Sequence, residues 1–103
     1  ENLLDEDYCK VKRIIVKPGE RLSYQYHHKR TEHWVVVQGK ATVTLDHQEA
    51  VFDEGEIIII PAGTKHRVEN KDEEDLIFIE TQTGTYFGED DIVRLEDDYG
   101  RKE

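Results

Sequence analysis

The sequence predicts an all-β domain, a sandwich or barrel of short strands, and three observations support this fold class. Turn-forming residues recur about every 8 to 12 residues, which is the strand spacing of sandwiches and barrels. The segments between these turns either alternate apolar and polar residues or are continuously apolar. No helical periodicity of useful length occurs before Gly88. At 103 residues the chain is long enough for one such domain around one core.

Each predicted strand is an apolar or alternating run that ends at a turn signal. Pro18-Gly19 ends the first run, and Gly39-Lys40 and His47-Gln48 separate later ones. The run at 57–60, four isoleucines, is apolar on both faces, so we expect it in the middle of the sandwich. In chain order the predicted strands are residues 11–17, 22–28, 32–38, 41–46, 49–52, 57–60, 65–70 and 76–82.

The two ends of the chain are less determined by pattern. In the acidic run 89–91, Asp90 or Asp91 can cap a last turn of helix, so the run needs no metal-binding role. The acidic runs 72–75 and 97–98 are interpreted as solvated loops. The first residue is Glu rather than Met, so we expect either that residues precede it or that the domain is cut from a longer protein.

Composition and charge limit the classes of partner. The formal net charge of −10 and the pI near 4.9 argue against nucleic acid, because a phosphate backbone would be repelled. An anionic sugar phosphate needs only a local cluster of cations. We expect that cluster among Lys29, Arg30, Lys65, Arg67, Arg94 and Arg101.

Cysteine usage and hydropathy indicate the compartment. The single cysteine, Cys9, excludes an internal disulfide, which fits a reducing cytoplasm. No apolar run approaches the length needed to cross a membrane, and residues 1–10 are acidic and polar rather than a signal peptide. We therefore expect a soluble, cytoplasmic protein.

Side chains able to hold a metal ion converge on one hairpin. Alternate residues of a strand share a face, so Gln25 and His27 point the same way. The polar turn that follows brings Glu32 back beside them. An amide oxygen, an imidazole and a carboxylate make three ligands of a mixed oxygen and nitrogen site. His66, on the strand after the turn at 61–63, supplies a fourth.

The two halves of this pattern resemble the two motifs of the cupins, which are double-stranded β-helix, or jelly-roll, barrels. The first motif runs glycine, five residues, HxH, three or four residues, glutamate, six residues, glycine. The second runs glycine, five residues, PxG, two residues, histidine, three residues, asparagine. Gln25 stands where the first motif has its first histidine. The positions that match are Gly19, His27, Glu32 and Gly39 in the first motif and Gly55, Pro61, Gly63, His66 and Asn70 in the second.

Within the cupins, the Q-x-H variant and the sequence of the tail resemble the C-terminal isomerase domain of type II mannose-6-phosphate isomerases. The stretches that carry this resemblance are 27–34, 61–67 and 84–101, and it extends over about residues 11–101. Many members of that family are fused to a mannose-1-phosphate guanylyltransferase, whose glycine-rich nucleotide loop is absent from these residues. The resemblance implies a single cupin domain over 1–103, with a family-specific tail, 84–103, packed on the barrel.

The resemblance also implies an activity and a cofactor. The expected reaction interconverts mannose 6-phosphate and fructose 6-phosphate through a cis-enediolate. The expected cofactor is a divalent metal, zinc first, with manganese, cobalt, nickel or iron as alternatives. Its ligands would be Gln25, His27, Glu32 and His66.

The resemblance also implies roles for the charged residues around this site. Arg94, in the tail, and Arg30, two residues before a ligand, are expected to be catalytic or substrate-binding cations. Substrate binding is also assigned to Lys29, Lys65 and Arg101. The base that moves the proton is left open among His33, Glu80, Asp91 and Tyr99.

Plainer interpretations remain open beside these. His27 can be an ordinary strand histidine, Gln25 a polar residue facing the barrel interior, and Arg30 an exposed turn arginine. Packing in the core or sheet is expected of Trp34, Tyr24, Tyr26 and Phe78, and a surface position of His28 and His47. Two other functions are carried as alternatives: a non-catalytic sugar-binding or regulatory cupin, and a metal-dependent oxygenase that uses iron. Exposed sheet edges in so short a chain favour a homodimer.

Overall fold

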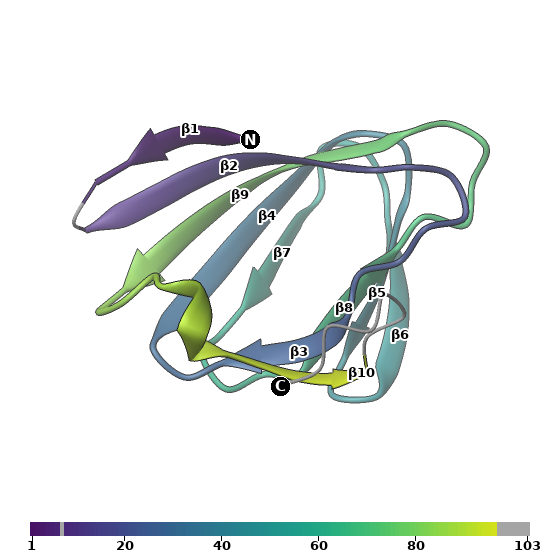
Figure 1. Cartoon of the computed structure of the whole chain (residues 1–103). Coiled ribbons are helices and arrows are strands. Elements are labelled where there is room, and N and C mark those ends of the chain that lie inside the picture. Colours follow the sequence, from purple (N-terminus) through teal and green to yellow (C-terminus); the bar gives the residue numbers. More distant parts are fainter. Residues whose placement is uncertain (7, 97–103) are drawn as a thin grey trace.

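The computed structural model of the protein describes residues 1–6 and 8–96. These residues form two five-stranded antiparallel sheets that face each other as the two walls of a barrel (Figure 1). The strand order is β1-β2-β9-β4-β7 in the first sheet and β10-β3-β8-β5-β6 in the second. The all-β jelly-roll prediction is therefore confirmed.

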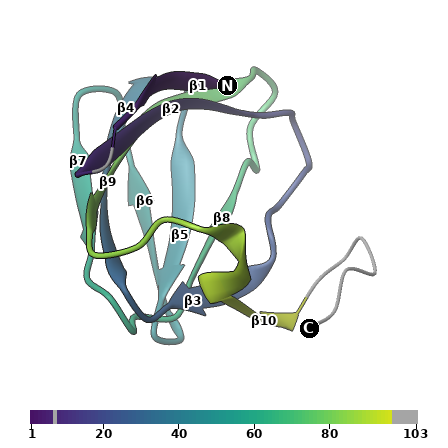
Figure 2. The same cartoon turned by 60° about the vertical axis from the view of Figure 1, so that its left-hand side comes forward.

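The first sheet consists of β1 (Asn2–Asp5), β2 (Cys9–Val16), β9 (Leu76–Gly84), β4 (Arg30–Gln38) and β7 (Ile57–Ile60). The second consists of β10 (Ile92–Glu96), β3 (Tyr24–His27), β8 (His66–Glu69), β5 (Ala41–Leu45) and β6 (Gln48–Phe52). One 3-10 turn, η1 (Glu89–Asp91), joins β9 to β10 and lies at the barrel end beside β3 (Figure 2). Within the described residues, no helix has the length and hydropathy needed to span a membrane.

The core fills one end of the barrel, and polar side chains fill the other. Along β4 the inward residues change from Val36 and Trp34 to the buried Glu32 and Arg30. Along β9 they change in the same direction, from leucine and phenylalanine to glutamate and glutamine. Because β4 and β9 are paired antiparallel, the two polar segments meet at one end. The apolar end is built from Val16, Trp34, Val36, Ala41, Val43, Ile58, Ile60, Val68, Leu76 and Phe78.

The position of β7 differs from the prediction. The four isoleucines lie at the edge of the first sheet, not in its middle, and Ile57 and Ile59 are 60% and 56% exposed. Ile58 and Ile60 are buried in the core. An apolar run indicates that both faces of a strand are kept from water, but it does not indicate whether this chain covers both. In β7 the described part of the chain covers only the inward face, which carries Ile58 and Ile60.

Two strands were missed by sequence reasoning. Strand β1 is exposed at all four positions and shows no alternation, so nothing in its sequence indicates a strand. Strand β10 pairs with β3 and closes the second sheet next to the polar end of the barrel. This strand lies within the predicted tail, 84–103. Residues 97–103 lie outside the described residues.

Several positions of the two cupin motifs have structural explanations. Gly39 has a φ of 82°, and a Cβ there would lie 2.9 Å from the carbonyl oxygen of Asp75. Asn70 is fully buried, and its Nδ2 donates to the carbonyl oxygens of Val16 (2.9 Å) and Glu74 (2.7 Å). These residues hold turns and loops, so the chemistry of the site has to come from the remaining motif positions.

Candidate metal centre

Three ionisable side chains from three strands meet at the polar end of the barrel. His27 ends β3, Glu32 lies on β4 and His66 begins β8, and each is only 2% exposed. One ligand atom from each lies within 4.8 Å of the others. His27 Nδ1 is 3.6 Å from Glu32 Oε2, and His66 Nε2 is 3.9 Å from Glu32 Oε1. The two hairpins therefore bring three of the four predicted ligands close together.

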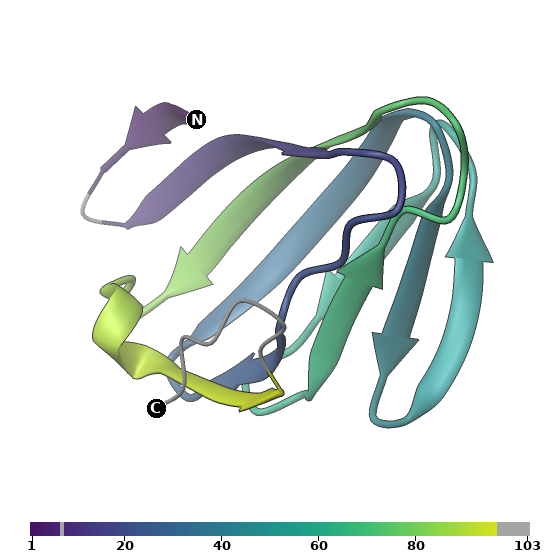
Figure 3. The same cartoon turned by 45° about the vertical axis from the view of Figure 1, so that its right-hand side comes forward.

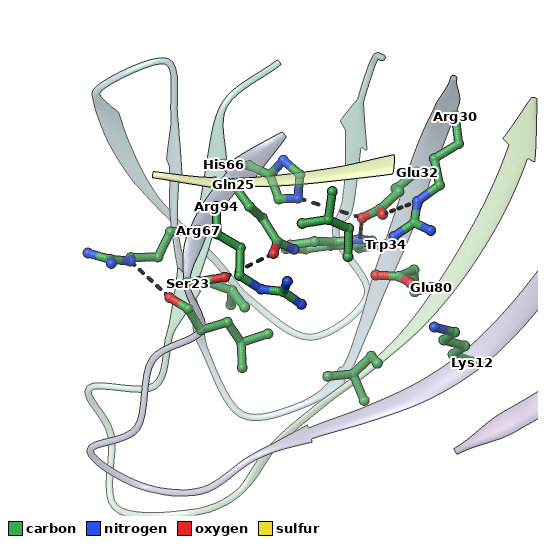
Figure 4. Close-up of a pocket in the computed structure, with 14 residues that line it drawn as sticks. Lys12, Ser23, Gln25, Arg30, Glu32, Trp34, His66, Arg67, Glu80 and Arg94 are labelled. Atoms are coloured by element: carbon green, nitrogen blue, oxygen red, sulfur yellow. Dashed lines mark hydrogen bonds and ion pairs between the residues drawn. The ribbon is translucent and has the colours of Figure 1, made fainter. Parts of the chain in front are cut away.

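The carboxylate of Glu32 is held from both sides. Trp34 Nε1 donates to Oε1 at 3.0 Å, and Arg30 Nε donates to Oε2 at 3.0 Å (Figure 4). Donors on both oxygens fix the plane of a carboxylate. Trp34 therefore has a second role besides packing in the core, where its ring stacks on Phe78 with centroids 4.6 Å apart.

His66 presents an unprotonated nitrogen to the same site. Its Nδ1 lies 3.0 Å from the carbonyl oxygen of Thr64, which can only accept, so Nδ1 carries the hydrogen and Nε2 carries the lone pair. Nε2 is buried and has no hydrogen-bond partner among residues 1–6 and 8–96. Burial also lowers the pKa of His66 and so favours the neutral ring. A buried lone pair oriented in this way suits a metal ion.

His27 is also neutral at physiological pH. Burial, and next the nearby Arg30, lower the pKa of His27 to about 3. Its Nε2 accepts from Arg30 Nη2 at 2.6 Å. Arg30 is 4% exposed, and its Nη1 also donates to the carbonyl oxygen of Phe87 at 3.3 Å. The interpretation of Arg30 as an exposed turn residue is therefore wrong, because it lies buried against two of the three clustered side chains.

Gln25 lies next to this cluster. It is the partner of His66 in the β3–β8 register, and its side chain lines the cavity described below. Gln25 Oε1 accepts from Ser23 Oγ at 2.9 Å (Figure 4). The fourth predicted ligand is thus beside the other three.

A cavity of about 180 Å³ opens beside the cluster, between the two sheets. Arg94 enters it from β10, opposite Gln25, and Lys12 enters it from β2 (Figure 4). With Arg30, three cations point into a space that also contains side chains of the types that bind metals, whereas the Arg67 guanidinium points away from it and donates from Nε to the carbonyl oxygen of Leu22 at 2.9 Å (Figure 4). The complete lining is Lys12, Ile14, Leu22, Ser23, Gln25, Arg30, Glu32, Trp34, His66, Arg67, Val68, Glu80, Ile92 and Arg94.

Glu80 is the second carboxylate in this lining. It lies on β9 directly between Trp34 of β4 and Lys12 of β2 in the sheet register, and Gln82 Nε2 donates to its Oε2 at 2.6 Å. Burial, and next the charge of Glu32, raise the pKa of Glu80 to about 7. Such a carboxyl can both lose and gain a proton near neutral pH.

Sequence reasoning missed Lys12. The signal that could have found it is the alternation of β2, in which Lys12, Ile14 and Val16 share the inward face. A lysine in that series marks the point where the inward face changes from apolar to polar. The same change occurs on β4 and β9.

Other residues predicted for the site lie outside the cavity lining. Lys29 is exposed, with its Nζ 5.4 Å from the ring centre of Tyr86, and Lys65 is half-buried next to the β5–β6 turn. Among the candidate bases, His33 faces outward from β4, and Asp91 Oδ2 accepts from the backbone N–H groups of His28 and Lys29. Predictions for Tyr99 and Arg101 fall outside the described residues.

Surface and packing predictions can be checked in the same way. His28 and His47 are exposed, and Tyr24, Trp34 and Phe78 are buried, as expected. Tyr26 is half-buried, with its ring edge-on to His28.

Comparison with known proteins decides the family. Residues 1–97 match the family described as the mannose-6-phosphate isomerase C-terminal domain. The chain belongs to this family. The fold that the cupin resemblance implies is confirmed, since similar solved structures include cupin and double-stranded β-helix domains.

Relatives in sequence are much longer than this domain of the mannose-6-phosphate isomerase C-terminal family. A mannose-1-phosphate guanylyltransferase of Escherichia coli K12 is 53% identical over 95 residues, which is 92% of this chain and 20% of that protein. The alginate biosynthesis protein AlgA of Pseudomonas aeruginosa is 53% identical over 91 residues, 88% of this chain and 19% of that protein. The chain therefore spans about a fifth of the length of these relatives.

Relatives in structure share the fold. A double-stranded β-helix protein of Klebsiella pneumoniae has a TM-score of 0.82 at 21% identity, covering 93% of this chain and 77% of its own. The cupin domain of Schizosaccharomyces pombe Cnp3 has a TM-score of 0.79 at 16% identity, covering 82% of this chain and 62% of its own. At these identities the likeness concerns the barrel and not the activity.

Proposed function

We propose that this domain is a metal-dependent isomerase that interconverts mannose 6-phosphate and fructose 6-phosphate. The observation that carries the proposal is the buried cluster of His27, Glu32 and His66 beside a cavity lined by cations, in a member of a family named for this isomerase. In the longer relatives this domain corresponds to about a fifth of the chain. We propose that here, too, it acts as the isomerase part next to a guanylyltransferase part.

The donor set supports a divalent ion. Two neutral imidazoles and a carboxylate match zinc, and Gln25 offers an amide oxygen as a fourth ligand. The lone pair of His66 Nε2 is the most direct sign, because it is buried without a protein partner in the described part of the chain. When bound, such an ion supplies a Lewis acid that polarises the carbonyl of an open-chain sugar.

The chain's own residues would bind the substrate and move its proton. Isomerisation of an aldose to a ketose transfers a proton between the second and first carbons of the sugar, through a cis-enediolate. Glu80 is the carboxylate of the cavity that is not among the proposed ligands, so we assign it the proton transfer. Arg30 lies close enough to the cluster to stabilise negative charge on the reacting oxygens.

The remaining cations suit the phosphate group. Lys12 and Arg94 enter the cavity from strands of the two opposite sheets, so a dianion can be approached from two sides. Lys12 here takes the place of Lys29 and Lys65 in the sequence-based proposal. A reducing, cytoplasmic location remains our expectation, and Cys9 is free in the structure.

The test is a direct assay of the purified domain with zinc, cobalt, manganese or no metal. Mannose 6-phosphate is supplied, and fructose 6-phosphate and sugar-phosphate binding are both measured. We expect metal-dependent turnover. Binding without turnover by a folded, metal-loaded domain would contradict catalysis and would favour the alternative of a sugar-phosphate-binding cupin.

A further inference from the structure

The outer face of the first sheet is apolar although no described part of the chain covers it (Figures 1 and 3). Exposure is highest at Ile15, Val37, Ile57 and Ile59, whose exposed fractions run from 48% to 60%. The cross-strand register places further branched residues between them, for example Val35 opposite both Ile57 and Ile79. We call the outward positions of β2, β9, β4 and β7 the outer apolar face. They are Cys9, Val11, Arg13, Ile15, Thr31, His33, Val35, Val37, Ile57, Ile59, Ile77, Ile79, Thr81 and Thr83.

The outer face of the second sheet has a different composition. Its outward positions on β5, β6 and β8 are mainly polar or charged: Thr42, Thr44, Glu49, Val51, Arg67 and Glu69. A sheet with one face in water alternates apolar and polar residues in this way, whereas strands covered on both faces are continuously apolar. The first sheet has the second pattern. Its outer face therefore has the composition of a surface that is covered.

The outer apolar face is also free of acidic side chains. None of its positions is Asp or Glu, although the chain has 24 such residues and a net charge of −10. Its one arginine, Arg13, is paired with the carboxylate of Glu1. Two identical chains of this charge repel over most of their surfaces. They can approach each other at a face whose own strand positions carry no carboxylate, and the outer apolar face is such a place.

The size of the face is sufficient for a specific interface. Each strand residue covers about 16 Å² of flat sheet, from a rise of about 3.4 Å and a strand separation of about 4.8 Å. Strands β2, β9, β4 and β7 have eight, nine, nine and four residues, which gives a face of about 500 Å². Two such faces bury about 1,000 Å², the size at which specific protein interfaces begin.

We propose that the outer apolar face binds a second copy of this chain in a two-fold symmetric dimer. The same patch serves both partners, as an isologous contact requires, and two regular sheets pack face to face about 10 Å apart. The edge position of β7 then has a physical reason, because Ile57 and Ile59 are buried by the partner and not by their own chain.

This inference goes beyond the proposed function and can fail without it. Gln25, His27 and His66 lie on the second sheet, and Glu32, the one proposed ligand on a strand of the outer apolar face, points to the opposite side: on β4, Glu32 and Trp34 point inward, and His33 and Val35 point outward. Changing an outward residue leaves the inward cluster intact. Dimerisation and metal binding can therefore be measured separately.

The test compares matched lysine substitutions by sedimentation equilibrium. Val37→Lys and Ile59→Lys place a charge in the outer apolar face, while Val51→Lys places one at an equally exposed valine on β6 of the second sheet. We expect wild type and Val51→Lys to have twice the chain mass of 12.1 kDa. We expect Ile59→Lys and Val37→Lys to raise the dissociation constant by about 10-fold or more. Circular dichroism verifies that each variant is folded.

A second measurement needs no variant. Small-angle scattering over a dilution series should show a radius of gyration that falls towards that of the single chain, 12.9 Å for its Cα atoms. Wild-type protein that stays monomeric at all concentrations would overturn the proposal and would leave the face to another part of a longer polypeptide. Equal dissociation of Val51→Lys and Ile59→Lys would also overturn it, because the contact would then not be at this face.

Discussion

Each carboxylate oxygen of Glu32 has its own hydrogen-bond donor and its own histidine neighbour. Glu32 therefore connects the side chains of the candidate site. Trp34 and Arg30 orient it, and His27 and His66 stand on either side within 4 Å. An isosteric amide at this position keeps the shape but loses the negative charge that an ion needs. The residue scale therefore offers a substitution that separates metal binding from folding.

The first prediction concerns Glu32→Gln. We expect zinc affinity to fall by about 100-fold or more, because a charged ligand is replaced by a neutral one. The fold should remain, since Glu32 contributes no apolar surface to the core. Metal analysis after dialysis, with circular dichroism, measures both. Glu49→Gln, an exposed carboxylate on β6, is the control, and full zinc occupancy in Glu32→Gln would show that the ligand set is wrong.

The second prediction concerns Glu80→Gln. We expect turnover to fall by about 100-fold or more, because general acid and base catalysis contributes this much. Zinc content and sugar-phosphate binding should stay close to wild type, because Glu80 is not a proposed ligand. Steady-state kinetics and isothermal titration calorimetry separate the two effects. A variant with wild-type turnover would remove Glu80 from the mechanism.

The third prediction is a pH dependence of stability in the metal-free protein. The pKa of Glu80 is raised in the folded state, to about 7 from an ordinary value of 4.5, so the folded protein holds this proton more tightly than the unfolded chain. Its contribution is complete below pH 4.5 and is lost as the pH rises through 7. His27, whose pKa is lowered, acts in the opposite direction as the pH falls below 6.5.

The difference between wild type and Glu80→Gln isolates the contribution of Glu80. The free energy of unfolding of wild type, minus that of the variant, should decrease between pH 4.5 and pH 7. Urea denaturation at several pH values, in the presence of a chelator, measures this difference. A difference that is flat over this range would mean that the carboxyl is not desolvated as the structure shows it.

At the scale of the elements, the sequence predicts the strands whose two faces differ. The inward residues of β4 and β9 alternate with outward ones, and both strands are found as expected. The alternation also brings Glu32 to the interior. Alternation cannot predict β1, because its four residues are all exposed. It also cannot predict the edge position of β7, because the order of strands in a sheet depends on contacts between residues far apart in sequence.

The candidate site was predictable where spacing in the chain sets geometry. His27, Glu32 and His66 sit on short hairpins with fixed turns, and the structure brings them together. Lys12 and Glu80 come from β2 and β9, which are far apart in sequence. Their meeting depends on the strand register, so the sequence did not indicate Lys12 at all and gave Glu80 only as one of four candidate bases.

The fourth prediction belongs to the turns that join these elements. Gly39→Ala should lower the free energy of unfolding by about 1 to 3 kcal/mol, since a residue with a Cβ is strained at a φ of 82° and meets Asp75. Gly55→Ala is the control, with a similar φ of 87° but open space around a Cβ. Urea denaturation should show a smaller loss for Gly55→Ala, and equal losses would contradict the close approach at Gly39.

At the scale of the whole molecule, the inner and outer surfaces of the sheets differ in composition. The inner surfaces hold the core at one end and the proposed metal ligands at the other, while the outer apolar face of the first sheet is proposed to bind another copy. In relatives about five times longer, the stretch that matches this chain is about a fifth of the protein.

Anomalous diffraction from crystals grown with zinc tests the central claim most directly. The account predicts one strong peak per chain, at about 2.0 to 2.2 Å from nitrogen atoms of His27 and His66 and from an oxygen of Glu32. A peak at another position, with these three side chains arranged as they are without the ion, would contradict it.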